Sequence, residues 1–174
     1  MTRINCAAAL NGMALTSLCL LSSKTQTMSE MELKQALGDF MDLFKAVPFS
    51  EDATIPDASA ETLLSDTLKL GRFDIKEDDY GRLISPQPKS AVYLTYYRNN
   101  ILHLFALPGL IMASVFAKKG IHRNSILQLV AALYPLLQKE LFLHLSQDEA
   151  LKHTDALVTA LLESGLMRQE GEIL

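Results

Sequence analysis

The chain has 174 residues, of which 49% are hydrophobic, so it is long enough to bury a core as a single domain. It carries 16 Lys and Arg against 20 Asp and Glu, a formal net charge of −4. This balance weighs against nucleic-acid binding, which requires a concentrated basic surface. Charged residues make up only 21% of the chain, and a long run near its middle is rich in Leu, Met and Phe, which excludes wholesale disorder.

The N-terminal segment imitates a signal peptide or a first membrane span, because Arg3 precedes a charge-free run over 4–23. Polar residues interrupt that run and favour a buried helix instead: Asn5, Asn11, Gly12, Thr16 and Ser17. Its apolar residues keep helical spacing: Ile4, Ala8, Met13 or Ala14, Leu15 and Leu18. On one helix, Cys6 and Cys19 would lie about 20 Å apart, too far for a disulfide, so we expect reduced core thiols.

A second helix is expected to begin at Ser29, because Ser29 and Glu32 form the S-x-x-E pattern of a capping box. Its apolar face is expected to hold Leu33, Leu37, Phe40 and Phe44. Pro48 ends it, and a loop follows. A third helix is predicted from Ser59 to a cap at Gly71.

A β-hairpin is predicted over 73–84, where Phe73 and Ile75 alternate with charged residues before a turn. The same order returns near the end of the chain, with a Ser146–Glu149 capping box, a Gly165 cap and a strand from Leu166. The second hairpin stops at Leu174, so we expect a truncated chain. The acidic residues of the two hairpins indicate packing modules and not DNA readers: Asp74, Glu77, Asp78, Asp79, Glu170 and Glu172.

Between these modules lie two apolar stretches, 94–116 and 126–145. Residues 101–117 are nearly free of charge, a length at the lower edge of a membrane span, and Pro108 with Gly109 interrupts them. This run is compatible with a single membrane span and with burial inside the protein. We favour burial with one face near a membrane. The predicted fold is therefore mainly α-helical: two winged-helix-like modules with short β-hairpins, 1–89 and 146–174, flank an apolar helical hairpin, 90–145.

Arg98 stands at the head of the apolar segment, among Tyr96, Tyr97, Asn99 and Asn100. A guanidinium that enters an apolar core must be hydrogen-bonded, and these neighbours supply acceptors and donors. We favour a structural polar network. The open alternative is a binding site for a phosphate or carboxylate, which arginine recognises through paired bonds.

A short basic patch follows the apolar run, with Lys118, Lys119, His122 and Arg123. A solvated helix connection explains it, and contact of Lys118, Lys119 and Arg123 with anionic lipid headgroups is the functional alternative. The four histidines and two cysteines show no metal-ligand spacing, and the eight glycines form no phosphate-binding loop. We therefore expect no metal and no cofactor.

The string LTYYRNNI over 94–101 closely resembles the bacterial membrane-associated glycerol-3-phosphate acyltransferase family. Leu107-Pro108, Leu133-Tyr134-Pro135 and the KELFL string over 139–143 extend the likeness downstream. Val47-Pro48 and Phe73-Asp74-Ile75 extend it upstream in the same order. The likeness covers essentially the whole chain, and TYYRNN is an uncommon hexapeptide.

The resemblance implies an enzyme that transfers a fatty acyl group from acyl-CoA or acyl-carrier protein to the 1-hydroxyl of glycerol 3-phosphate. It implies a place at the cytoplasmic face of the bacterial inner membrane. The family's H-x4-D motif, with histidine as general base, has no match at His103, His122 or His153. His144 comes nearest, but Glu149 stands where aspartate is required and is explained as a capping acid. No catalytic residue is carried over.

We therefore interpret 1–174 as a C-terminal accessory region that supports the catalytic domain of the same protein and lacks its reactive site. Through that domain it would work with acyl-CoA or acyl-carrier protein, and we expect no nucleic-acid partner. The alternative is a free-standing helical interaction module built of two winged-helix-like units.

Overall fold

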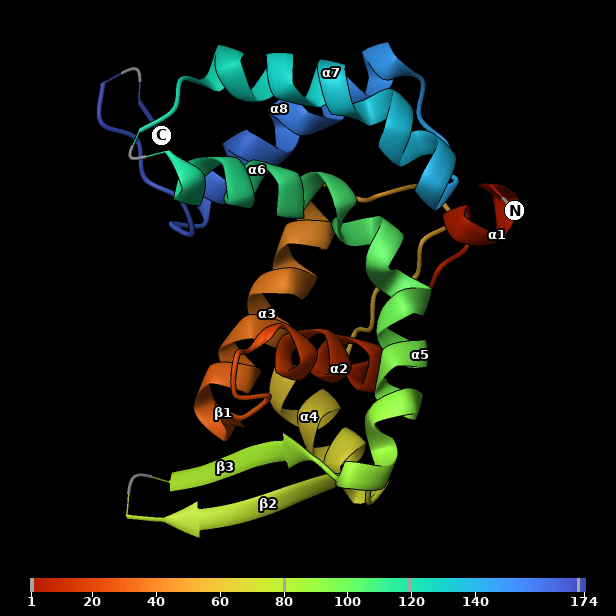
Figure 1. Cartoon of the computed structure of the whole chain (residues 1–174), viewed down its shortest axis with the longest axis vertical. Helices are drawn as coiled ribbons and strands as arrows, with labels where there is room; N and C mark the ends of the chain where they lie inside the picture. The colour runs from red at the N-terminus through yellow and green to blue at the C-terminus, as the bar shows by residue number, and fades with distance from the viewer. Residues whose placement is uncertain (1, 80, 119, 172) are drawn as a thin grey trace. The chain divides into compact units, whose positions relative to one another are not determined.

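The computed structural model describes residues 2–79, 81–118, 120–171 and 173–174, without the side chains of Thr2, Arg3 and Asp78. Lys119 and Glu172, which the sequence analysis singled out, lie outside these residues. The described chain is mainly helical, as predicted, with one small antiparallel sheet (Figure 1).

The chain forms two compact units. Unit 1 consists of Met1–Ala7, Leu43–Asp52 and His103–Leu174. Unit 2 consists of Ala8–Asp42 and Ala53–Leu102. The chain thus passes between the units several times, whereas the three segments expected from the sequence follow one another along the chain.

The N-terminal run is two helices and not one, so the single helix predicted over 4–23 is wrong. α1 spans Thr2–Cys6, and α2 spans Gly12–Ser22. The break between them pairs with a distant segment, because Leu10 N donates to Thr54 O at 2.9 Å and Thr54 N donates to Ala8 O at 3.0 Å. Asn11 then caps α2 by accepting a bond from Ala14 N at 2.9 Å.

α2 is buried on nearly all sides, in keeping with its polar but uncharged sequence. Leu15 and Leu20 are fully buried, and Thr16 and Ser17 are equally inaccessible. Ile4, which was predicted to share this buried face, lies in α1 and is 74% exposed. Cys6 and Cys19 are both free thiols, and burial raises the pKa of Cys19 to about 12.

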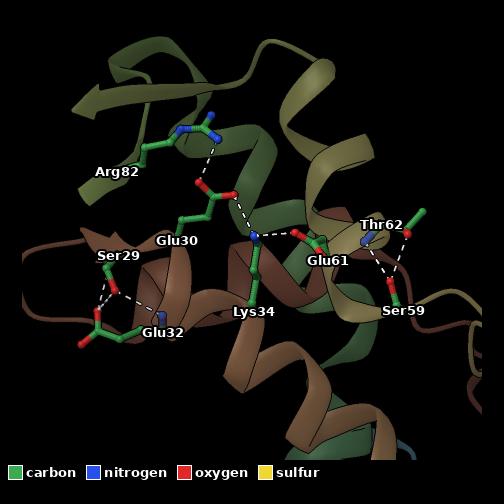
Figure 2. Close-up of polar contacts among 8 residues, drawn as sticks. All are labelled: Ser29, Glu30, Glu32, Lys34, Ser59, Glu61, Thr62 and Arg82. Carbon is green, nitrogen blue, oxygen red and sulfur yellow. Dashed lines mark hydrogen bonds and ion pairs between the residues drawn. The ribbon is translucent and has the colours of Figure 1, made fainter. Parts of the chain in front are cut away.

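The predicted second helix is α3, Glu30–Ala46, and it starts with the expected capping box. Ser29 N donates to Glu32 Oε2 at 2.9 Å, and Glu32 N donates to Ser29 Oγ at 3.2 Å (Figure 2). Leu33, Leu37 and Phe44 of its predicted face are buried, while Phe40 is half-buried. The capping chemistry and the apolar spacing therefore predicted this helix correctly.

The third predicted helix is α4, Ala60–Lys69, capped by Ser59, which accepts from Thr62 N at 3.2 Å (Figure 2). The predicted hairpin follows as β2, Phe73–Asp78, and β3, Gly81–Pro86. A strand that was not predicted, β1 at Met28–Ser29, pairs with β3 and gives the order β1-β3-β2. The register places Phe73 opposite Pro86.

A chain of ion pairs joins β3, α3 and α4 in unit 2 (Figure 2). Glu30 Oε2 forms an ion pair with Arg82 Nη1 at 2.8 Å, and Glu30 Oε1 forms one with Lys34 Nζ at 3.2 Å. Lys34 Nζ also lies 2.9 Å from Glu61 Oε1. Glu30 is the least exposed member, so the network centres on its carboxylate.

An interrupted helical stretch runs from Pro88 to Ala117. It comprises the 3-10 turn η1, Pro88–Ser90; α5, Ala91–Ile101; the 3-10 turn η2, Leu102–Phe105; and α6, Ala106–Ala117. Within the part of the chain that the structure describes, this is the one stretch long and apolar enough to cross a membrane by length and composition. Core helices of soluble proteins have the same length and composition.

Within unit 1, α6 packs against α7, Arg123–Leu141, and α8, Gln147–Glu163, which also pack on each other (Figure 1). Ile111, Val130 and Leu157 are fully buried in this group. The predicted Ser146–Glu149 capping box is present at the start of α8. Within unit 2, α2 packs against both α4 and α5.

The second predicted hairpin is not formed by the described residues. Leu166 and Met167 lie in a bend after α8, and Glu170 makes only an isolated bridge to Ile173. The tail instead pairs with the segment before α7, because Leu174 N donates to Ile121 O at 3.0 Å. Two apolar residues after a glycine cap predict a strand, but the partner that orders this tail lies about fifty positions upstream.

Candidate functional site

α5 presents large apolar and aromatic side chains to solvent in unit 2. Val92 is 83% exposed, Tyr96 63% and Tyr93 51%. On the opposite side of the helix, Leu94 and Ile101 are buried where α5 packs against α2. The helix therefore carries apolar groups on the face that a solvated helix would fill with polar ones.

Ring contacts order this exposed face. The Arg72 guanidinium lies 4.8 Å from the centroid of the Tyr93 ring, at cation–π distance. The Tyr97 ring lies 5.8 Å from that of Tyr93 and 5.7 Å from that of Tyr96. We use the name α5 surface for Arg72, Val92, Tyr93, Tyr96, Tyr97 and Arg98.

Arg98, the predicted head of a polar network, lies on this surface. Its Nε and Nη2 donate to Asn99 Oδ1 at 3.2 and 2.9 Å. Asn99 and Asn100 are exposed, and Arg98 and Tyr97 are half-buried. The structure thus joins Arg98 to Asn99 at the edge of unit 2 and does not enclose the guanidinium in a core.

The two described basic residues of the patch after α6, Lys118 and Arg123, have different environments. Lys118, at the end of α6, is exposed. Arg123, the first residue of α7, is committed to α8: its Nε donates to Asp155 Oδ1 at 2.5 Å, and its Nη2 donates to Asp155 O at 2.7 Å and Thr159 Oγ1 at 2.8 Å. Arg123 therefore joins two helices of unit 1, and its charge is already paired.

A groove of about 430 Å³ opens between α6 and α7, within unit 1. Lys118, Ser114, Ser125 and Gln128 supply its polar groups, and Leu129 is among its apolar walls. Its volume is in the range of small-molecule sites. One exposed ammonium and two hydroxyls do not specify a ligand.

Three histidines gather around Phe49 in unit 1, and we call them the Phe49 histidine cluster: His103, His144 and His153. The Phe49 ring meets the rings of His103 and His144 edge to face, at 5.4 and 4.8 Å between centroids. His103 Nε2 lies 3.0 Å from Asn5 O. His103, His153 and Phe49 also line a cavity of about 10 Å³, at the lower limit of the space that can hold one water molecule.

Burial is the main cause that lowers the pKa of all three histidines. The neighbouring charge of His144 further lowers the pKa of His103 and His153, while a bond to Asn5 raises that of His103 and Glu149 raises that of His144. Among the described atoms, His144 Nδ1 is buried without a hydrogen-bond partner. The cluster is thus suited to holding neutral imidazoles.

The His144–Glu149 pair does not form a base with an orienting acid. Glu149 Oε2 accepts from Ser146 N at 2.8 Å and from Ser146 Oγ at 2.6 Å, so its carboxylate caps α8. These bonds lower the pKa of Glu149. Across the ranges that the structure covers, no three His, Cys, Asp or Glu residues are placed to hold a metal ion.

The Phe49 histidine cluster was not predicted from the sequence. Its members lie up to 50 positions apart, with no fixed spacing, and Phe49 comes from a loop. The signal that could have found them is only the presence of histidines in an otherwise apolar run.

A family model described as the glycerol-3-phosphate acyltransferase C-terminal region matches residues 1–173. A protein named glycerol-3-phosphate acyltransferase from Alteromonas mediterranea is 86% identical over 174 residues, which are 100% of this chain and 21% of that protein. Proteins of the same name from Pseudoalteromonas atlantica and Aeromonas hydrophila are 49% and 44% identical, over 100% and 96% of this chain and 22% and 21% of their own lengths.

The chain therefore spans about a fifth of the length of the curated relatives that it matches. These matches confirm the resemblance carried by the TYYRNN segment and its downstream strings. The match extends over both units and is not restricted to one motif. This chain belongs to the family of glycerol-3-phosphate acyltransferase C-terminal regions.

Proposed function

We propose that this chain is part of a glycerol-3-phosphate 1-O-acyltransferase. The enzyme transfers a fatty acyl group from acyl-CoA or acyl-carrier protein to glycerol 3-phosphate, the first step of phospholipid synthesis. The observation that carries this proposal is the family match over residues 1–173, together with relatives of that name that contain the whole of this chain.

Within that enzyme, the region supports the catalytic domain and supplies no general base. Burial holds the pKa of His103 and His153 below the ordinary value, and Glu149 is bonded to Ser146 and not to His144. A histidine base needs an open path to the substrate hydroxyl and an orienting carboxylate. The imidazoles of the Phe49 histidine cluster act as packing groups in unit 1.

The region also works at the cytoplasmic face of the bacterial inner membrane. Lys118 is exposed at the end of α6, next to apolar residues such as Phe116, which is 81% exposed. An exposed ammonium beside an exposed aromatic ring suits contact with anionic headgroups. Because Arg123 is paired with Asp155, Lys118 is the described basic residue that carries this contact.

The test uses a chimera in which this chain replaces the matching 174 residues of the Alteromonas mediterranea enzyme. Acyl transfer from acyl-CoA to glycerol 3-phosphate is measured for the chimera, for the unaltered enzyme and for this chain alone. We expect comparable turnover from the first two and none from the third. A folded chimera without activity would contradict the proposed family role, and turnover by the chain alone would contradict its supporting role.

A further inference from the structure

The α5 surface exposes three large apolar or aromatic side chains of unit 2, Val92, Tyr93 and Tyr96. Val92, Tyr93 and Tyr96 come from adjoining positions of one helix face, while Leu94 and Ile101 on the other face bind α5 to α2. Scattered exposed apolar residues are normal in proteins, but contiguous ones on one element mark an interaction site. The face is therefore a candidate interface.

Its composition is that of the centre of a protein interface. Tyrosine and arginine are the side chains most enriched among residues that dominate binding energy. Arg72 and Arg98 add positive charge to the three phenol rings, and no carboxylate in the described part of the chain forms an ion pair with either. A complementary partner surface would combine apolar side chains with unpaired carboxylates.

The rings are already ordered before any partner binds. Tyr97 contacts both Tyr93 and Tyr96, Arg72 covers the Tyr93 ring, and Asn99 fixes the Arg98 guanidinium. Each ordered side chain reduces the entropy that association would otherwise cost. The α5 surface is therefore pre-organised to bind a partner of fixed shape.

The identity of that partner follows from the length of the family's proteins. In each relative the matching segment is about a fifth of the polypeptide, so about four fifths of that polypeptide lies in the same molecule as the segment. A tethered partner is present at an effective concentration near ~1 mM, far above that of a separate protein. We propose that the α5 surface docks on the preceding part of the same acyltransferase polypeptide, through apolar side chains flanked by carboxylates.

This proposal rests on the proposed function, and its test uses the full-length chimera described above. A photoreactive phenylalanine, p-benzoyl-phenylalanine, replaces Tyr96, and a matched variant carries it at Met31. Met31 lies on α3 in the same unit and is 78% exposed, so both positions accept the probe without disturbing a core. Irradiated chimera is digested, and cross-linked peptides are identified by mass spectrometry.

We expect the probe at position 96 to cross-link to peptides that precede this chain, with a yield several-fold above that at position 31. Replacing Arg98 with alanine should reduce that yield several-fold. Equal yields at the two positions, or cross-links from position 96 to lipid, to a second copy or within these 174 residues, would overturn the proposal. Acyl transfer by the same chimera distinguishes failure of the docking proposal from failure of the proposed function. If the chimera is active but the cross-links differ from those expected, only the docking proposal is contradicted.

Discussion

The Gly12→Ala substitution should destabilise unit 2, because Gly12 lies where α2 meets α4 without room for a side chain. A Cβ built at Gly12 would overlap with Thr67 Oγ1 and lie 2.8 Å from the Leu63 carbonyl oxygen. The Thr67 hydroxyl is buried and donates to that same carbonyl at 2.7 Å. Neither the backbone oxygen nor the bonded hydroxyl can move without loss.

The expected cost follows from opposing effects. Overpacking costs about 1–3 kcal/mol, and loss of the Thr67 hydrogen bond adds about 1 kcal/mol. The higher helix propensity of alanine offsets at most about 1 kcal/mol. We expect Gly12→Ala to lower the free energy of unfolding by roughly 2 kcal/mol, which lowers Tm by roughly 4–8 °C in a chain of this size.

The assay is urea unfolding followed by far-UV circular dichroism, with hydrogen exchange to locate the effect in α2 and α4. Gly109→Ala is the matched control, because it lies in α6 with nothing within 4 Å of a built Cβ, and it should stabilise by about 0.5–1 kcal/mol. Removing the Thr67 hydroxyl should reduce the cost of Gly12→Ala. If both glycine substitutions shift the midpoint in the same direction, the reasoning about close helix packing is wrong.

Three further perturbations test the remaining interactions. Glu30→Gln should lower the free energy of unfolding by about 1 kcal/mol in urea titrations, because it breaks two ion pairs, whereas Asp66→Asn in an exposed pair should change it by less than about 0.5 kcal/mol. Lys118→Gln should weaken sedimentation with anionic liposomes about fivefold, and unchanged pelleting would remove the lipid contact. The Phe49 histidine cluster has folded-state pKa values below 6.5, so the unfolded chain binds more protons under that pH. The contribution of this cluster to the free energy of unfolding should therefore be complete above pH 7 and decline as the pH falls toward 5. A urea midpoint that rises as the pH falls from 7 to 5 would contradict this expectation.

The elements that the sequence predicted well are those specified by adjacent residues. The capping boxes at Ser29 and Ser146 and the hairpin at Phe73 depend on side chains a few positions apart. The break after α1 depends instead on bonds between Ala8, Leu10 and Thr54, and β1 exists only because β3 lies beside it. Interactions between distant segments leave no periodic pattern in the sequence.

The same distinction applies to the candidate sites. The TYYRNN string drew attention to Arg98, but whether its guanidinium lies in a core depends on which face of α5 packs on α2. Leu94 and Ile101 take that face, so Arg98 lies half-buried at its border while Asn99 and Asn100 are exposed. The Phe49 histidine cluster is a product of tertiary packing alone.

A tethered docking surface can be too weak to make the isolated chain associate. Burying Val92, Tyr93 and Tyr96 would contribute a gross gain on the order of 5 kcal/mol. Association of separate molecules costs about 4 kcal/mol or more in lost translational and rotational freedom, which offsets most of this gain. A tethered surface has already lost most of that freedom, so it keeps more of the gain. The isolated chain is therefore expected to be monomeric in sedimentation at micromolar concentration, while the identical surface stays docked within the parent polypeptide. A stable micromolar dimer through α5 would mean that the contacts are stronger than these areas allow and that a second copy is the better occupant.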